Sequence, residues 1–264
     1  MYPEVFHISF LHTYGVLVAL GFLAGLWMAG RLGVKAGLNA EHITNLGLYC
    51  ALAALIGAKL MMLAVDAGDY WQHPDRIFSL ETLQAGGVFY GGLLGALAVS
   101  WVYLRKARLP ALVVADVFAP GIALGHAIGR IGCFAAGCCW GTECHLPWAV
   151  TFTNPAAHQL VGVPLDVPLH PAQLYESAAE FAIFGILYWR SERGHGRGDI
   201  ISLYLMLYGA ARFAVEFFRN HEQGNLWGTP LDASQWISLV LFLAGAAHFV
   251  VGKRWANRAG EARG

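Results

Sequence analysis

Three residues with functional side chains recur at intervals of four within an otherwise apolar segment. Tyr208, Arg212 and Glu216 lie in the segment 200–218. Because an α-helix turns every 3.6 residues, intervals of four place these side chains on one helix face. There Glu216 can hold Arg212 through a charge-assisted hydrogen bond. Two interpretations are open: a structural ion pair, or a guanidinium group that is held ready for an anion.

A second polar set comprises Asp116, His126 and Arg130, in and directly after the apolar segment 111–129. His126 and Arg130 are again four residues apart. Since a planar guanidinium group can donate two hydrogen bonds to one phosphate, two such arginines favour a site for a phospholipid head group. The alternative is that Arg130 extends to the membrane interface for solvation. Lys59, a further cation in an apolar segment, has the same two interpretations.

The composition indicates which class of protein carries these residues. Of the 264 residues, 57% are hydrophobic and 13% are charged, with no net charge. Soluble domains have roughly 45–50% apolar and about 25% charged residues. This composition excludes a disordered chain, which would be polar and charged, and disfavours a nucleic-acid-binding protein, which would show a basic excess. An integral membrane protein is therefore expected.

Apolar segments of suitable length support this expectation. A helix that crosses a bilayer needs about 20 mainly apolar residues. Seven candidate spans run over residues 14–30, 43–65, 87–104, 111–129, 173–189, 200–218 and 233–251. The fourth is the weakest candidate, because it contains Asp116, Pro120 and His126. The predicted fold is an all-α integral membrane protein with seven transmembrane helices.

The distribution of lysine and arginine predicts the orientation. Twelve of these residues lie in connecting segments on one side of the predicted bilayer and three on the other. Because basic residues concentrate in cytoplasmic loops, the N-terminus is expected outside and the C-terminus in the cytoplasm. The whole chain, 1–264, is expected to form a single transmembrane domain. Residues 130–172, rich in Gly, Pro, Cys and Trp, are predicted to form a small ordered cap on the outer side.

Four of the five cysteines lie in this predicted cap, at Cys133, Cys138, Cys139 and Cys144. Cysteines on the outer, oxidising side of a membrane commonly form disulfides, so a disulfide within the cap is the favoured interpretation. Free thiols and a metal site are the alternatives. Because the spacing fits no standard zinc pattern, no residue is assigned as a metal ligand.

Motifs along nearly the whole chain resemble the prolipoprotein diacylglyceryl transferase family, and they occur in the family's order. The matching residues are 14–15, 57–59, 90–93, Asp116, 129–141, 170–176, 208–219 and 235–238. The most specific are His170-Pro171-Ala172-Gln173 and the set of Tyr208, Arg212 and Glu216. The glycine pair at 91–92 alone would be weak.

The resemblance implies an enzyme that crosses the bacterial cytoplasmic (inner) membrane several times. In the implied reaction, phosphatidylglycerol donates its diacylglyceryl group to the thiol of the lipobox cysteine in a prolipoprotein. A thioether forms and glycerol phosphate leaves, without a metal or soluble cofactor. The implied partners are phosphatidylglycerol, the signal peptide of the lipoprotein precursor and the bilayer, with no nucleic acid.

Chemistry and resemblance together suggest roles for individual residues. Arg130 and Arg212 would stabilise the charge of the leaving phosphate, and Glu216 would orient Arg212. The general base is open between Tyr90 and His126, and a tyrosine would need a cationic neighbour for this role. The residues that the resemblance implies in substrate binding are Tyr14, Lys59, Asp116, Arg130, Gly141, His170, Gln173 and Tyr208.

Several positions depart from the family pattern. The family usually has Asn at the positions of Cys133 and Ala136, Glu at Cys138 and His at Tyr90. The two arginines are kept, whereas the expected base and part of the signature loop are not. Two alternatives therefore stand beside the transferase. One is a related membrane transferase with a different acceptor, and the other is a non-catalytic lipid-binding or thiol-redox membrane protein.

Overall fold

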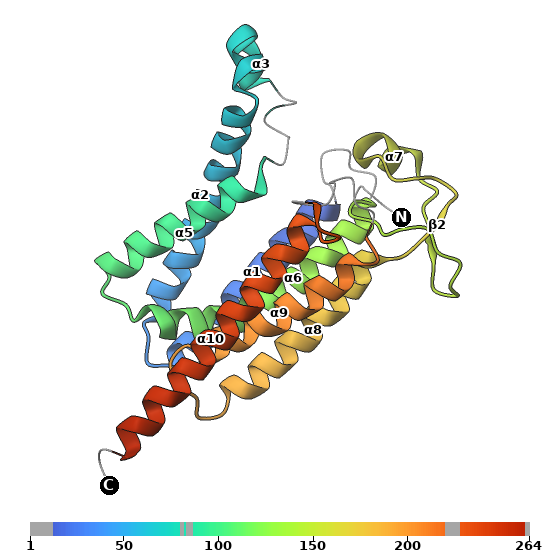
Figure 1. Ribbon diagram of the computed structural model, residues 1–264. Coiled ribbons are helices and arrows are strands. Elements are labelled where there is room, and N and C mark those ends of the chain that lie inside the picture. Colours follow the sequence, from blue (N-terminus) through green and yellow to red (C-terminus); the bar gives the residue numbers. More distant parts are fainter. Residues whose placement is uncertain (1–12, 80–81, 83–86, 220–227, 262–264) are drawn as a thin grey trace. The chain divides into compact units, whose positions relative to one another are not determined.

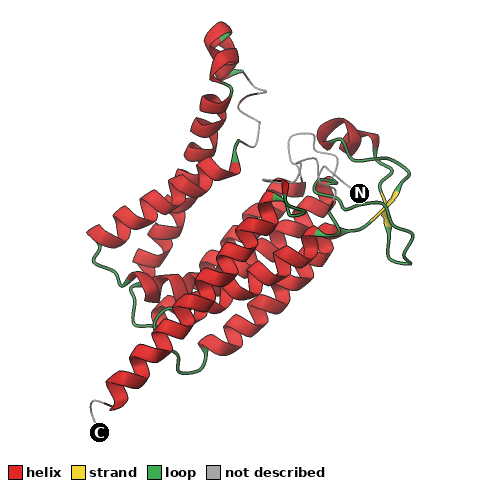
Figure 2. Ribbon diagram, viewed as in Figure 1, coloured by secondary structure: helices red, strands yellow, loops and turns green. Residues whose placement is uncertain are grey.

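The computed structural model describes residues 13–79, 82, 87–219 and 228–261, which are predominantly helical (Figure 2). All seven segments that were predicted as spans form helices. These helices are α1 (Thr13–Lys35), α2 (Ala40–Val65), α5 (Phe89–Lys106), α6 (Ala111–Ala136), α8 (Ala172–Ser191), α9 (Asp199–Glu216) and α10 (Ala233–Glu261). The shorter elements are α3 (Ala67–Gln72), the 3₁₀-helix η1 (Pro74–Phe78), β1 (Val150–Thr151), α7 (Pro155–Val161) and β2 (Pro168–Leu169).

Four helices of the described chain are long and apolar enough to cross a membrane: α1, α2, α6 and the part of α10 over Ala233–Gly252. They include α6, which the sequence marked as the weakest candidate. That expectation was wrong, because α6 has the length and mean hydropathy of a span despite Asp116, Pro120 and His126. Its polar groups also contact partners within the protein. Asp116 accepts backbone hydrogen bonds, and His126 contacts Glu180. The described chain is therefore mainly helical, and four of its helices are suited to crossing a membrane.

The chain divides into two compact units. One unit, Gly33–Val114, holds α2 and α5, together with α3 and η1. Here α2 and α5 approach backbone to backbone, because small residues face each other. A Cβ atom added to Gly95 would lie 2.5 Å from the carbonyl oxygen of Ala53, and one added to Gly57 would overlap the carbonyl oxygen of Gly91. Such close approach is typical of small residues between membrane helices.

The other unit comprises Met1–Leu32 and Ala115–Gly264. Two pairs of glycines let α1 and α6 pack closely in it. A Cβ atom on Gly25 would lie 2.5 Å from Gly121 O, and one on Gly21 would lie 2.7 Å from Gly125 O. Such a contact is typical of small residues at the interface between membrane helices. It does not extend to Gly129, where an added Cβ would meet nothing within 4 Å.

The same unit has its main apolar core between α6, α8 and α9. The buried residues of this core are Ala119, Ala123, Ile183, Leu187, Ile200 and Tyr204. Helix α9 also packs against α10 (Figure 1). Because α6 and α9 run in the same direction and α8 runs against them, the C-terminal ends of α6 and α9 meet the N-terminal half of α8.

The loop region between α6 and α8 is ordered around a small core of its own. Phe152, Ala157, Val163 and Leu169 are buried there. Strands β1 and β2 pair antiparallel, with Val150 opposite Leu169. The backbone N–H of Thr142 donates to Phe218 O at 2.9 Å, which ties the region to the end of α9. This contact fixes the backbone next to the arginines described below.

Candidate functional site

Arg130 and Arg212 converge on one carboxylate. Arg130 Nη2 donates to Glu176 Oε2 at 2.5 Å, and Arg212 Nη1 lies 3.5 Å from the same oxygen. The three side chains come from α6, α9 and α8, and their exposed fractions are 13%, 11% and 5%. Two residues 82 positions apart in the chain therefore place their guanidinium groups side by side, as the phosphate-site hypothesis requires.

A second carboxylate holds Arg212 from the other side. Glu216 Oε2 lies 2.5 Å from Arg212 Nη2, one helical turn away, so the predicted pairing is confirmed. The same oxygen is 4.0 Å from Arg219 Nη1. Arg212 is thus fixed between Glu176 and Glu216. A guanidinium group that is fixed in this way needs little reorganisation when charge develops beside it.

His126 lies between two carboxylates of α8. Its Nε2 is 3.4 Å from Glu176 Oε1, and its Nδ1 is 2.9 Å from Glu180 Oε1. Nδ1 is hydrogen-bonded to Glu180, and Nε2 faces the Glu176 carboxylate at ion-pair distance, so both ring nitrogens point toward carboxylates of the protein. This geometry argues against His126 as the general base. The ring centroid of Tyr208 is 5.7 Å from that of His126, so Tyr208 belongs to the same cluster.

The cluster retains unused hydrogen-bond donors. Within the described residues, Arg130 Nε is buried and has no hydrogen-bond partner, and the buried Arg212 Nη1 has only its 3.5 Å ion-pair contact with Glu176. A buried donor without a partner costs about 1–3 kcal/mol, so such groups in native proteins commonly serve a ligand. The donors belong to the two guanidinium groups that share Glu176. An anion that reaches both could satisfy them together.

Tyr14 lies beside this cluster. A Cβ atom added to Gly132 would be 3.4 Å from Tyr14 Cδ2, which places the tyrosine ring of α1 against α6, two residues beyond Arg130. The Tyr14 side chain remains partly exposed, at 43%. Its position is compatible with the substrate contact that the resemblance implies.

Three predicted substrate residues instead support the loop after α6. Gln173 Nε2 donates to Cys138 O at 2.6 Å. His170 Nδ1 lies 3.0 Å from the hydroxyl of Tyr175. Gly141 fills a site where a Cβ atom would be 2.6 Å from His170 Cβ. Through these contacts, Gln173, His170 and Gly141 shape the backbone beside the arginines. None of the three contacts involves a guanidinium group.

Asp116 lies at the opposite end of α6 from Arg130. Fourteen residues of helix separate the two by about 21 Å. The carboxylate accepts the backbone N–H groups of Gly198 at 2.6 Å and Ile201 at 2.9 Å. It therefore caps the N-terminus of α9, where a negative charge is stabilising. This position argues against the predicted substrate-binding role of Asp116.

Lys59 and Tyr90 belong to the unit Gly33–Val114. Lys59 Nζ donates to Thr82 O at 2.6 Å within that unit. Tyr90 is half exposed near the start of α5, and its ring contacts Phe89. Their roles beside the arginine cluster remain predictions.

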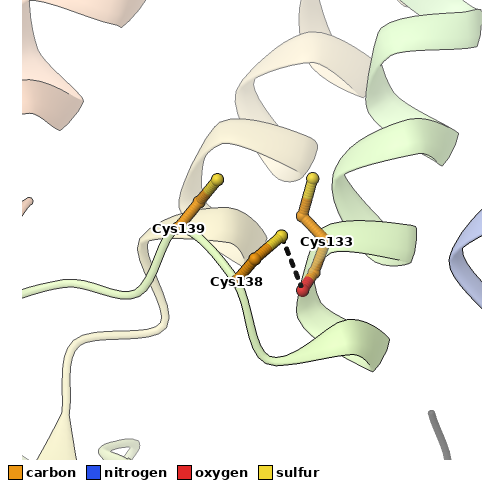
Figure 3. A group of neighbouring side chains, drawn as sticks. All are labelled: Cys133, Cys138 and Cys139. Carbon is orange, nitrogen blue, oxygen red and sulfur yellow. Dashed lines mark hydrogen bonds between the residues drawn. The ribbon is translucent and has the colours of Figure 1, made fainter. Parts of the chain in front are cut away.

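Three cysteines gather next to Arg130. The Sγ atoms of Cys133, Cys138 and Cys139 all lie within 4.8 Å of one another (Figure 3). Arg130 Nη1 is 3.8 Å from Cys133 Sγ. All five cysteines, each within the described residues, are free thiols, so the disulfide favoured by the sequence is not formed. Its absence leaves a group of soft ligands beside the cluster.

The thiols of the loop differ in their affinity for protons. The pKa of Cys139 lies well below its ordinary value, first because Cys133 and then Cys138 hydrogen-bond to its sulfur, and further because Arg130 and Arg219 attract its thiolate. The pKa of Cys138 lies well above its ordinary value, because its hydrogen bonds to Cys133 and Cys139 favour the protonated thiol.

The sequence reasoning missed the residues that bring the cluster together. Glu176 and Glu180 lie in the predicted span 173–189, but neither was predicted as a site residue. Their spacing of four residues places both on one face of α8, which is the signal that could have assigned them. Arg219 was also left out, because it follows the last helical turn of α9.

The fold and the site together define a class: a helical membrane protein that holds a buried arginine–carboxylate cluster where three of its helices meet. A family model described as "Prolipoprotein diacylglyceryl transferase" matches residues 3–251. The chain belongs to this family, which confirms the resemblance found in its motifs.

Curated relatives match over nearly their full length. A protein of Clostridium tetani named phosphatidylglycerol--prolipoprotein diacylglyceryl transferase is 35% identical over 93% of this chain and 95% of its own. A protein of the same name from Bordetella avium is 34% identical over 94% of this chain and 92% of its own. One from Clostridium perfringens, whose name ends in "transferase 2", is 30% identical over 95% and 94%.

Proposed function

We propose that this chain transfers the diacylglyceryl group of phosphatidylglycerol to the cysteine thiol of a prolipoprotein. The observation that carries this proposal is the meeting of Arg130 and Arg212 on Glu176, at 2.5 and 3.5 Å. The names of the relatives support the choice of donor and acceptor. The products are a thioether on the prolipoprotein and glycerol phosphate.

The arginines act on the leaving group. The sulfur of the acceptor attacks the glyceryl carbon, and the C–O bond to the phosphate breaks. Negative charge then grows on the phosphate oxygen, where the donors of Arg130 and Arg212 stabilise it. Glu176 and Glu216 hold both guanidinium groups in place before the reaction begins. A thiolate rather than a thiol is the reactive nucleophile, so the acceptor must lose its proton.

Other residues are proposed to contact the substrates. Tyr14 and Tyr208 border the arginine cluster and are suited to positioning the lipid. Tyr90 is the remaining protein candidate for the base, since both nitrogens of His126 are engaged. Lys59 is proposed to add positive charge for the head group. Both Lys59 and Tyr90 act from the unit Gly33–Val114 in this proposal.

The proposal includes a topology. Seven helices cross the bacterial cytoplasmic (inner) membrane, with the N-terminus outside and the C-terminus in the cytoplasm. Residues 1–264 act as one transferase domain, and residues 130–172 form its outer cap. The uneven distribution of basic residues between the two sides supports this orientation. It places the arginine cluster in the outer half of the membrane, where the signal peptide of a precursor would present its cysteine.

The test is the product itself. The full chain, purified in detergent, is mixed with phosphatidylglycerol and a peptide that carries a lipobox cysteine. The expected result is a gain of one diacylglyceryl group on the cysteine sulfur, stable to base as a thioether is, with release of glycerol phosphate. A matched peptide with serine in place of cysteine should gain nothing. An unmodified cysteine peptide, with the protein folded and lipid present, would contradict the proposal.

The second candidate function is that of a related membrane transferase with a different acceptor. It is favoured by Cys133 and Cys138, which replace residues that the family usually has. Rescue of a strain depleted of its own transferase distinguishes the two. Growth and lipidated prolipoproteins support the prolipoprotein acceptor. Lipidation of another membrane protein, with no rescue, would support the alternative.

A further inference from the structure

The three sulfur atoms beside Arg130 are held together by a tightly folded loop. Cys133 lies in the last turn of α6, whereas Cys138 and Cys139 follow the helix end (Figure 3). The chain reverses at Gly137, with φ of 79°, and at Cys139, with φ of 59°. A side chain other than glycine is uncommon in this left-handed region and is retained where surrounding contacts hold it.

Three hydrogen bonds hold this loop. Gln173 Nε2 donates to Cys138 O at 2.6 Å. The backbone N–H of Cys138 donates to Cys133 O at 3.1 Å, and Cys138 Sγ donates to the same oxygen at 3.6 Å. The loop is therefore fixed with its sulfur atoms turned toward Cys133. The buried amide of Gln173 gives this arrangement a support from α8 that is independent of the cysteines.

The arrangement has the donor set of a metal site with one open position. Zinc binds thiolates at about 2.3 Å, which gives sulfur–sulfur separations of roughly 3.8 Å in a tetrahedron. The three Sγ atoms, within 4.8 Å of one another, need to close by only about 1 Å, and rotation of the side chains can supply this. Catalytic zinc sites have three protein ligands and leave the fourth position to water or substrate.

The family resemblance implies a reaction without a metal, but Cys133 and Cys138 stand where the family usually has Asn and Glu. We propose that in this chain Cys133, Cys138 and Cys139 bind a zinc ion whose fourth position takes the thiol of the acceptor as a thiolate. This inference rests on the proposed function. It places the nucleophile beside Arg130, whose Nη1 is 3.8 Å from Cys133 Sγ and whose guanidinium group binds the donor phosphate. Three thiolates leave a zinc ion with one net negative charge, which the adjacent guanidinium group offsets.

The proposed step balances as follows. The acceptor thiol replaces a water at zinc and releases its proton to solvent. Its sulfur electron pair forms the S–C bond to the glyceryl carbon, and the C–O bonding pair leaves with the phosphate oxygen. Glycerol phosphate departs from Arg130 and Arg212. The thioether product is neutral and a weaker zinc ligand than a thiolate, so it leaves the metal.

The proposed zinc site supplies a way to deprotonate the acceptor thiol, which the arginine cluster lacks. Both nitrogens of His126 contact carboxylates, so this imidazole cannot take the proton of the acceptor. An ordinary cysteine thiol, with a pKa of about 8.5, is only about 3% thiolate at pH 7. Coordination by zinc deprotonates a thiol outright. A bound zinc ion would therefore raise the reactive fraction by about 30-fold at neutral pH.

Metal content is the first test. The full chain is purified in detergent under reducing conditions, loaded with zinc and freed of excess metal. We expect a single zinc ion per chain in the wild type and in Cys144→Ala, and none in the triple variant Cys133→Ala, Cys138→Ala, Cys139→Ala. Cys144→Ala is the matched control, because Cys144 is buried in the same region but outside the three-sulfur group. A wild type without zinc, or with a disulfide among the three cysteines, would overturn the proposal.

Cobalt gives a second test on the unchanged protein, so it does not depend on the folding of a variant. Cobalt(II) in the site should show thiolate charge-transfer absorption. This absorption should increase when a lipobox cysteine peptide is added, and stay constant with the serine peptide. If the thiolate absorption does not change when the cysteine peptide is added, the proposal that the fourth position is open to the acceptor is refuted.

The pH profile of transfer separates activation from a structural effect. Wild-type transfer should change little between pH 7 and 9, whereas the triple variant should be about 30-fold slower at pH 7 and recover toward pH 9. A purely structural defect would lower the rate equally at every pH. Equal profiles for the two proteins would defeat the inference and leave the proposed function intact. Zinc binding and a cobalt response without diacylglyceryl transfer would defeat the proposed function and leave the thiol-binding metal site.

Discussion

At the scale of single residues, Glu176 links the features of the site. Its Oε2 contacts Arg130 and Arg212, and its Oε1 contacts His126. The sequence indicated two arginines with anion-binding potential, but it could not indicate that one carboxylate from α8 lies between them. That pairing depends on how α6, α8 and α9 pack, which no local pattern encodes. The spacing of Glu176 and Glu180 was the available signal.

Removal of Glu176 should therefore destabilise the fold as well as the site. In Glu176→Ala, two buried guanidinium groups lose their shared partner, and breaking a buried ion pair in this way typically costs about 3–5 kcal/mol. Unfolding in detergent, followed by circular dichroism, measures this loss. Glu143→Ala is the control, because its side chain is 62% exposed and should change stability by less than about 0.5 kcal/mol. Equal stability of the two variants would refute the role of Glu176.

Asp116 gives a second prediction at this scale. Since it caps α9, Asp116→Ala should lower the unfolding free energy by about 0.5–2 kcal/mol, whereas Asp116→Asn keeps an acceptor and should lose less. The KM for phosphatidylglycerol, measured on the folded protein, should stay unchanged in both. A raised KM with normal stability would instead support the substrate-binding role that the sequence suggested.

At the scale of elements, the sequence predicted the helices well and their connections poorly. Each predicted span is a helix, because long apolar runs leave few other structures that satisfy the backbone in a membrane. The prediction ended α6 at residue 129, and the helix continues to Ala136. The extra turns carry Arg130 and Cys133, whose polar character ended the predicted span. The sequence indicated a cluster of cysteines but not which of them gather, because the group forms only when the chain reverses at Gly137 and Cys139.

The contact of α1 with α6 gives a prediction at this scale. In Gly25→Ala, the added Cβ atom would lie 2.5 Å from Gly121 O, so the helices must separate, and we expect a loss of about 1–3 kcal/mol in stability. Gly30→Ala introduces the same methyl group in the same helix where nothing lies within 4 Å. It should be neutral or stabilising by up to about 1 kcal/mol. Equal thermal unfolding midpoints for both variants would contradict the close packing.

At the scale of the whole molecule, four helices have the length and composition of membrane spans, and the full seven-span topology is a proposal. The composition predicted the membrane class because 57% hydrophobic residues cannot all be buried inside a soluble chain of this size. The division into two units had no counterpart in the sequence reasoning, which treated 1–264 as one domain. Local patterns specify each helix but carry little information about which helices pack together.

Reporter fusions test the topology. A reporter after Gly264, which lies outside the described residues, should be active only in the cytoplasm. A reporter inserted beside the exposed His145 should be active only outside. The basic residues of the connecting segments set this expectation. Both reporters on one side would refute the proposed number of spans.

The central claim is that Arg130 and Arg212 bind one phosphate together, and a double-mutant cycle tests it most directly. Transfer from phosphatidylglycerol to a lipobox peptide is measured for Arg130→Ala, Arg212→Ala and the double variant. Arg193→Ala is the control, because Arg193 follows the C-terminal end of α8 and donates to Trp189 O there. We predict a loss of about 10²–10³ for each single variant and a double-variant loss far smaller than their product, because the two groups act as a unit. Full activity in either single variant, or losses that multiply, would contradict the account.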